Sequence, residues 1–178
     1  MAFLVRKLIK RDRLSILEEI QNINDVKADI PTTEFRTTDG KLSTWLIDSL
    51  DELTDAVLAI AVSSSEVTKM DFIVIDTSLL EKHSLKYEQT YAGREIAVAD
   101  LQNKHHDIVD ITIGKLINCT NLYMDIIKNE TDEEKYIVRY TVGDIKEILK
   151  RAIIQKRIDE SKTDTKVREL ISKLNAAV

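Results

Sequence analysis

The stretch from Leu42 to Thr77 constrains the fold most, because its hydrophobic pattern changes from strand to helix and back to strand. LSTWLID at its start alternates as a strand does, and MDFIVID near its end is an apolar run rich in β-branched residues. Such a run is typical of a strand covered on both faces. Between them, Ser49 and Glu52 have the spacing of a capping box, and apolar residues follow at helical intervals. Parallel strands need a crossover of this kind, so the stretch predicts a parallel βαβ unit.

Further elements are expected around this unit: a strand at residues 2–8, a helix at 12–23 and an edge strand at 136–140. Residues 94–118 fit both a helical and a strand period, and we favour a helix interrupted near Gly114 or Asn118. Thr141 opens another helix, and a last helix follows a polar segment at residues 161–165. Residues 141–178 are therefore expected to form a helical pair that packs on the domain or extends from it.

Together these elements predict an α/β fold, with α+β as the alternative. We expect a small mixed sheet of about three or four strands around the central parallel βαβ unit, packed by about five helices. A length of 178 residues and a hydrophobic content of 43% suit one domain spanning residues 1–178.

Composition narrows the cellular setting. Cys119 is the only cysteine, which excludes an internal disulfide and a cysteine-based zinc cage. No stretch approaches the roughly 20 apolar residues of a membrane span. The first residues, MAFLVRKLIKRDR, lack the long hydrophobic region of a signal peptide. We therefore expect a cytoplasmic protein that does not enter a membrane.

Charge is distributed unevenly along the chain, with basic residues in excess at both ends and acidic residues in the middle. The helix carrying Lys146, Lys150, Arg151 and Arg157 could bind the phosphates of a nucleic acid. The alternative is a solvated face whose lysines pair with neighbouring carboxylates. A sequence pI of about 5.3 favours the second interpretation, since nucleic-acid domains are usually basic overall.

Familiar catalytic motifs are missing from the sequence. Its four glycines are too dispersed for a Walker loop or a dinucleotide fingerprint, which need clustered glycines beside the phosphates. The sequence also lacks a Gly-x-Ser-x-Gly elbow and a His-Glu-x-x-His helix. These observations argue against the nucleotide-binding proteins and hydrolases that use those motifs.

The carboxyl edge of the βαβ unit is the place where a site is expected, because ligands of open α/β sheets lie beyond the ends of their strands. Asp48 and Asp76 follow the two strands and could hold Mg²⁺ or act as an acid and base pair. His105 is a third catalytic candidate, while Arg94 and His83 are candidates for ligand binding. The alternative for both aspartates is that they cap their own turns. No other cofactor and no metal centre are expected.

Two functional hypotheses follow. The first is a small non-catalytic interaction or accessory protein that uses its terminal helices or an edge strand to bind another protein or itself. The second is a small enzyme or binding protein for a phosphorylated or nucleotide-like ligand at Asp48 and Asp76, which rests on topology alone. The lack of a catalytic constellation favours the first hypothesis.

Overall fold

The structure is a computed structural model that describes residues 2–91, 95–131 and 135–176. Its strands are β1 (Phe3–Lys7), β2 (Leu42–Ile47), β3 (Met70–Asp76), β4 (Lys86–Gln89), β5 (His105–Val109) and β6 (Ile137–Tyr140). Its α-helices are α1 (Arg11–Glu19), α2 (Asp29–Glu34), α3 (Leu53–Ser63), α4 (Thr77–Lys82), α5 (Ile113–Lys128), α6 (Val142–Ile154) and α7 (Thr165–Asn175). Short 3₁₀ turns lie at η1 (Ile23–Asp25), η2 (Leu50–Glu52), η3 (Ala99–Lys104) and η4 (Glu160–Lys162).

The strands of the described residues belong to one six-stranded sheet of order β4-β5-β2-β1-β3-β6, in which every neighbouring pair is antiparallel. The predicted parallel βαβ unit and the three- or four-stranded mixed sheet are therefore wrong, and the fold is α+β. β2, α3 and β3 form as expected, but β1 lies between the two strands: Phe3 pairs with Ile47 on one side and with Asp76 on the other. An apolar run shows that a strand is buried on both faces, and it does not show which strand lies beside it.

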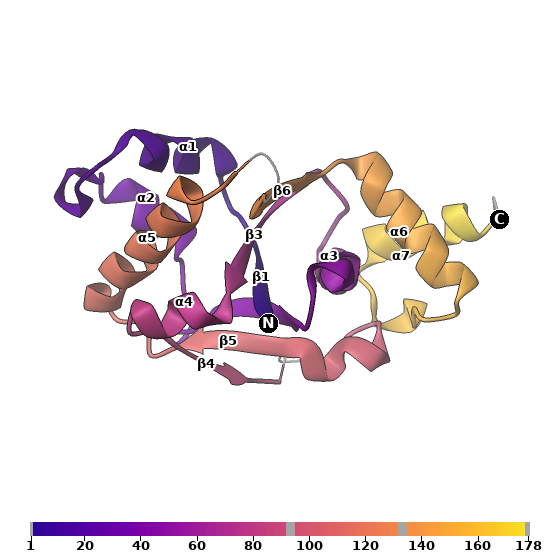
Figure 1. Ribbon diagram of the computed structural model, residues 1–178. Helices are drawn as coiled ribbons and strands as arrows, with labels where there is room; N and C mark the ends of the chain where they lie inside the picture. Colours follow the sequence, from indigo (N-terminus) through magenta and orange to yellow (C-terminus); the bar gives the residue numbers. More distant parts are fainter. Residues whose placement is uncertain (1, 92–94, 132–134, 177–178) are drawn as a thin grey trace.

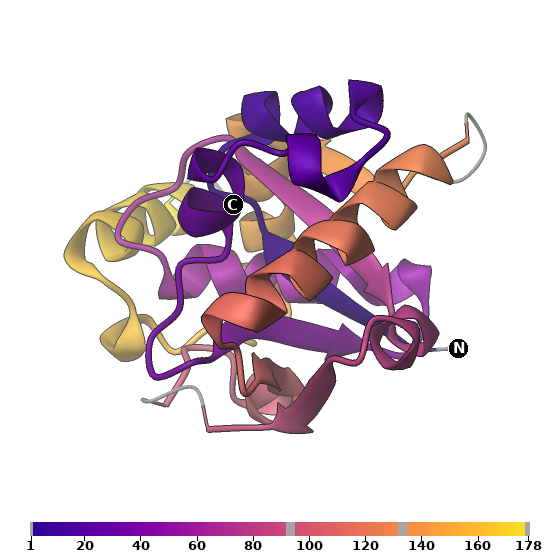
Figure 2. The same cartoon turned by 90° about the vertical axis from the view of Figure 1, so that its left-hand side faces the viewer.

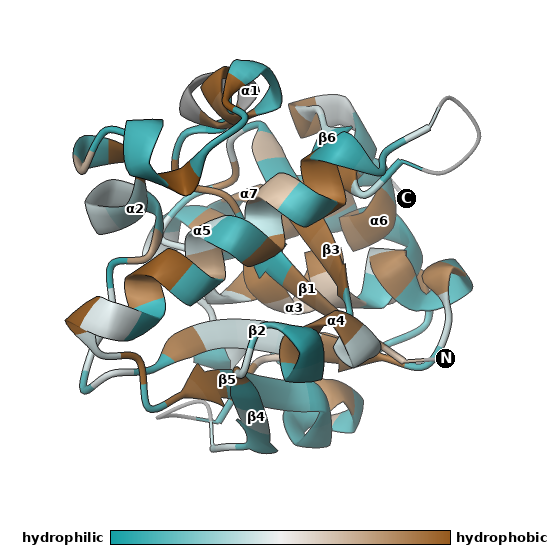
Figure 3. Cartoon of the chain, turned by 60° about the vertical axis from the view of Figure 1, so that its left-hand side comes forward, coloured by the Kyte–Doolittle hydropathy of each residue, from teal (hydrophilic) through white to brown (hydrophobic). Residues whose placement is uncertain are grey.

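Helices cover both faces of the sheet, which makes the molecule a three-layer structure (Figure 1). Alternate residues of each central strand supply the two cores, so that on β1 Val5 faces one core and Leu4 the other. α1, α2, α4 and α5 pack on the Leu4 face, where α5 crosses in front of the sheet (Figure 2). Apolar residues concentrate along the sheet and on the inner sides of the helices (Figure 3).

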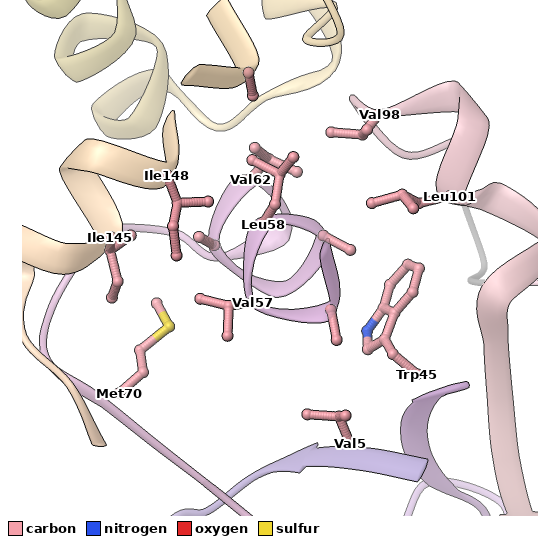
Figure 4. Packing of buried hydrophobic residues seen from close by; sticks show 14 of the residues in the cluster. Val5, Trp45, Val57, Leu58, Val62, Met70, Val98, Leu101, Ile145 and Ile148 are labelled. Carbon is pink, nitrogen blue, oxygen red and sulfur yellow. The ribbon is translucent and has the colours of Figure 1, made fainter. Parts of the chain in front are cut away.

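The opposite face carries α3, α6 and α7. Val57 and Leu58 of α3 lie between the sheet and Ile148 of α6, with Trp45 of β2 at one side (Figure 4). α7 packs against α6 and adds Leu174 to the same core. The apolar stripes of the two C-terminal helices are thus buried within their own chain.

The prediction of a helix over residues 94–118 is wrong in its middle part. Residues 105–109 form β5, between β2 and β4, and α5 then runs from Ile113 to Lys128 without a break at Gly114 or Asn118. His106 and Asp107 are buried in β5 although they are polar, and both of them take part in hydrogen bonds. A polar pair in a buried strand removes the apolar alternation by which a strand is recognised in a sequence. The described residues also contain more helices than the five expected.

Candidate functional site

Asp48 lies at the end of β2, where its carboxylate is exposed and bound to Lys104. The Lys104 Nζ atom lies 2.5 Å from Asp48 Oδ2 and 3.4 Å from Glu52 Oε2. The hydrogen bond from Lys104 holds the pKa of Asp48 below its ordinary value. Glu52 also accepts a hydrogen bond from the Asp48 amide, so it caps this turn without the side chain of Ser49.

Asp76 lies at the same edge of the sheet, beyond β1, and caps α4. Its carboxylate accepts a hydrogen bond of 2.9 Å from the Ser78 amide. Asp76 lines a cavity of about 250 Å³ together with Asp125 and Tyr136, and Asp48 is not part of that lining. Asp48 and Asp76 thus lie at the same end of their strands but line no common cavity among the described residues. Asp48 is held by its ion pair with Lys104, and Asp76 is held by the turn that it caps.

Of the two candidates for ligand binding, the structure describes only His83. His83 Nε2 lies 2.9 Å from Asp125 Oδ2, and Lys82 Nζ lies 2.6 Å from the same oxygen. The hydrogen bond from Lys82, aided by His83, holds the pKa of Asp125 below its ordinary value. Arg94 lies outside the described residues.

The predicted basic face is partly neutralised by carboxylates. Arg157 donates hydrogen bonds from Nη1 to Asp55 at 2.8 Å and from Nη2 to Asp100 at 2.7 Å. Lys150 lies 2.6 Å from Glu147 on the next helical turn. Arg151 lines a shallow cavity beside Arg157, whereas Lys146 is not part of its lining. Lys150 is thus paired within α6, whereas Arg157 lies beyond the end of α6 and pairs with carboxylates from other parts of the chain.

His105 differs from the other candidates because it is buried beside a cavity and held at both ring nitrogens. Its Nε2 lies 2.8 Å from Ser43 Oγ, and its Nδ1 lies 3.0 Å from Thr90 Oγ1. Thr90 Oγ1 donates in turn to Asp107 Oδ2 at 2.8 Å. The Thr90 hydroxyl proton is therefore directed to Asp107, and its oxygen accepts from Nδ1–H. With its proton on Nδ1, the His105 ring has an unprotonated Nε2, which accepts a hydrogen bond from the Ser43 hydroxyl.

Strand register assembles this network. Ser43 pairs with Asp107 across β2 and β5, and Trp45 pairs with His105 two residues farther along. Val5 pairs with Trp45 across β1 and β2, and Lys7, two residues beyond Val5, lines the same cavity as Ser43. Directly opposed residues of an antiparallel pair have Cβ atoms roughly 5 Å apart. Ser43, Asp107 and Lys7 thus lie on the same face of the sheet.

A cavity of about 340 Å³ opens over this face, at the end of the sheet opposite to Asp48 and Asp76. Its polar wall includes Lys7, Ser43 and His105, and its apolar wall includes Trp45 and Ile96. The Trp45 and His105 rings meet edge to face with centroids 5.2 Å apart. Desolvation lowers the pKa of Lys7, although the side chain as a whole is exposed. Polar groups converging in a half-apolar cavity are the usual form of a small-ligand site.

Of these residues, sequence reasoning singled out only His105. Ser43, Thr90 and Asp107 are distant from one another in sequence, and Ser43 has no motif around it. A sequence feature that could have indicated strand β5 is the alternation of Val109 and Ile111, which fits a strand near these residues. Even a correct strand prediction would have lacked the register that joins Ser43 to Asp107.

No family model, no curated protein and no solved structure matches the chain. Over residues 2–91, 95–131 and 135–176, no group of three or more His, Cys, Asp or Glu side chains is placed to hold a metal ion. None of the described helices is both long and apolar enough to cross a membrane.

A second surface feature lies on the opposite layer, between α5 and the segment from η1 to α2. This α5 groove has a volume of about 350 Å³ and is lined by Ile23, Asn24, Val26, Ala28, Pro31, Thr32, Ile113, Leu116, Ile117 and Thr120. Ile113, at the first turn of α5, is 88% exposed, and Ile117 is 53% exposed. Two large aliphatic side chains thus stand in solvent on adjacent turns of one helix, beside a mainly apolar hollow.

Proposed function

We propose that this chain is a cytoplasmic interaction protein that binds another protein, or a second copy of itself, through the α5 groove. The observation that carries the proposal is the exposure of Ile113 and Ile117 beside the groove. Contiguous exposed apolar surface on a folded protein commonly marks an interaction site, since covering it releases the water that it orders. Leu116 and Val26 are already half-buried there and extend the surface that a partner would cover.

The two places first expected to bind a partner have weaker support. The apolar positions of α6 and α7 are largely buried in their own core. The predicted edge strand is β6, which forms one edge of the sheet but has only four residues, Ile137–Tyr140. Its exposed residue, Arg139, is charged and bound to Asp71, and a charge on an edge strand is a common way to keep it from pairing.

The test compares wild-type protein with Ile113→Lys and Ile117→Lys in light scattering after size exclusion and in cross-linking within the native host. We expect an oligomer, or a stoichiometric partner, that both substitutions remove. Ile154→Lys is the matched control, because Ile154 of α6 is 62% exposed and lies outside the groove. A wild-type monomer whose cross-linked partners survive the Ile113→Lys substitution would overturn the proposal.

A further inference from the structure

We propose that Ser43 is a nucleophile, activated by His105, that accepts acyl groups from small esters in the cavity over the Lys7 face of the sheet. This activity goes beyond the proposed interaction function and uses none of the groove residues. Ser43 is exposed at the cavity wall. His105, only 6% exposed, lies behind it. A substrate would therefore meet the hydroxyl first and the base behind it.

The geometry meets the two requirements for activating a serine. A serine hydroxyl is a weak nucleophile unless an adjacent base removes its proton, and the Ser43 Oγ to His105 Nε2 distance of 2.8 Å lies within hydrogen-bond reach. The base must also be held in the correct tautomer. Thr90 accepts from Nδ1 and is itself fixed by Asp107 Oδ2, while Asp107 Oδ1 lies 4.0 Å from Nε2, the nitrogen that faces Ser43. The Asp107 carboxylate would stabilise the imidazolium that forms during attack.

Lys7 supplies the positive charge that the reaction needs. Lys7 lines the same cavity as Ser43, on the same face of the sheet, so its ammonium group would stabilise the negative charge that forms on the oxygen of an attacked carbonyl. The neighbouring Arg6 guanidinium cannot take this role readily. It donates from Nη1 to the Ser43 carbonyl and from Nη2 to the Glu34 carbonyl, each at 3.0 Å, and so fixes the backbone on which Ser43 stands.

The chemical steps balance without a cofactor. Ser43 Oγ attacks the ester carbonyl carbon while its proton passes to His105 Nε2. The ester C–O bond then breaks, and the alcohol leaves with the proton from Nε2. Water attacks the acyl-serine with His105 again accepting a proton, which releases the carboxylic acid and restores Ser43. The apolar wall formed by Trp45, Ile60 and Ile96 suits a short apolar acyl group.

The experiment treats the full chain with a fluorophosphonate and follows the adduct by intact mass, followed by peptide mapping. We expect one adduct on Ser43, absent in Ser43→Ala and formed about 100-fold more slowly in His105→Gln. Lys7→Met should slow the reaction while leaving the thermal unfolding curve in place. Ser172→Ala, on the exposed side of α7, is the control and should react as wild type does.

Two outcomes would overturn the proposal: a wild-type chain that forms no adduct on Ser43, or a His105→Gln variant that reacts at the wild-type rate. Mapping the adduct on wild-type protein does not depend on whether any variant folds. Turnover of p-nitrophenyl butyrate, lost in Ser43→Ala, then separates a true esterase from a serine that is acylated only once. Neither result bears on the α5 groove, so this proposal and the interaction proposal fail separately.

Discussion

Asp71 joins three segments that are distant in sequence. It lies on β3, where Arg139 of β6 donates from Nε to its Oδ1 at 2.7 Å, and Arg11 at the start of α1 lies 3.3 Å from the same oxygen. Burial alone would raise the pKa of Asp71, but the hydrogen bonds from Arg139 and Arg11 outweigh it and hold the pKa below its ordinary value. The side chain is only 13% exposed, so solvent screens these contacts less than it screens surface pairs.

We expect Asp71→Asn to destabilise the protein by about 1–3 kcal/mol near neutral pH, since two charged donors lose their partner. Because the folded-state pKa is depressed, the contribution of Asp71 is present above the ordinary aspartate pKa and is lost as pH falls through the folded value. The gap between wild type and variant in urea unfolding should therefore narrow in acid. Asp51→Asn, on an exposed turn, should change stability by less than about 0.5 kcal/mol. A pH-independent gap for Asp71→Asn would contradict this account.

His105 shows how far single residues could be interpreted from the sequence. Histidine is a frequent catalytic residue, and the structure places His105 at a cavity. Asp48 and Asp76 were chosen by the rule for parallel sheets, which does not govern this antiparallel one. Ser43 could not be found at all, because its importance comes from two neighbouring strands rather than from nearby sequence.

At the scale of elements, the two predicted helix starts differ in how they are capped. Thr141 and Asp144 form a complete capping box at α6: the Thr141 hydroxyl accepts from the Asp144 amide, and Asp144 accepts from the Thr141 amide. Ser49 and Glu52 have the same spacing, but Ser49 makes no capping hydrogen bond. A 3₁₀ turn, η2, separates Ser49 from α3, so the residue that precedes α3 is Glu52 and not Ser49.

Thr141→Ala should therefore cost about 1 kcal/mol of stability, within the usual range of about 0.5–2 kcal/mol for a lost N-cap. Ser49→Ala tests the opposite expectation and should change stability by only a few tenths of a kcal/mol. Both values come from urea unfolding at one temperature. Equal losses for the two variants would show that the hydrogen bonds at Thr141 do not stabilise α6 as argued.

Strands and helices with clear periods were predicted well, and the polar strand was not. β1, β2, β3 and β6 appear close to their expected residues. α6 and α7 also appear where expected, because each has a full apolar stripe. β5 was missed because His105, His106 and Asp107 occupy buried positions that are usually apolar. Their polar groups are satisfied by partners that become neighbours only in the folded sheet.

At the scale of the whole molecule, the position of β1 decides the topology. An amino-terminal strand inserted between β2 and β3 converts an expected parallel pair into two antiparallel ones. Periodicity reports burial and not pairing, so the strand order could not be obtained from the sequence. The insertion also gives both cores a common wall, since β1 and β3 contribute alternate residues to each.

This shared wall predicts that the two faces of the sheet unfold together. Leu149→Ala in α6 and Leu122→Ala in α5 remove fully buried side chains from opposite cores, and each should cost about 2–5 kcal/mol. Trp45, the single tryptophan, lies in the Leu149 core and reports on that face by its fluorescence. Because β1 and β3 belong to both cores, Leu122→Ala should lower the fluorescence midpoint and the circular-dichroism midpoint in urea by the same amount.

Ile154→Ala provides the control on an exposed site and should leave both midpoints nearly unchanged. Leu122→Ala is the informative variant, because Leu122 lies in the core that does not contain Trp45. A circular-dichroism midpoint that falls while the Trp45 midpoint stays in place would mean that the α5 layer unfolds independently. In that case the sheet would not transmit the loss of packing from one face to the other, and the chain would not behave as one cooperative domain.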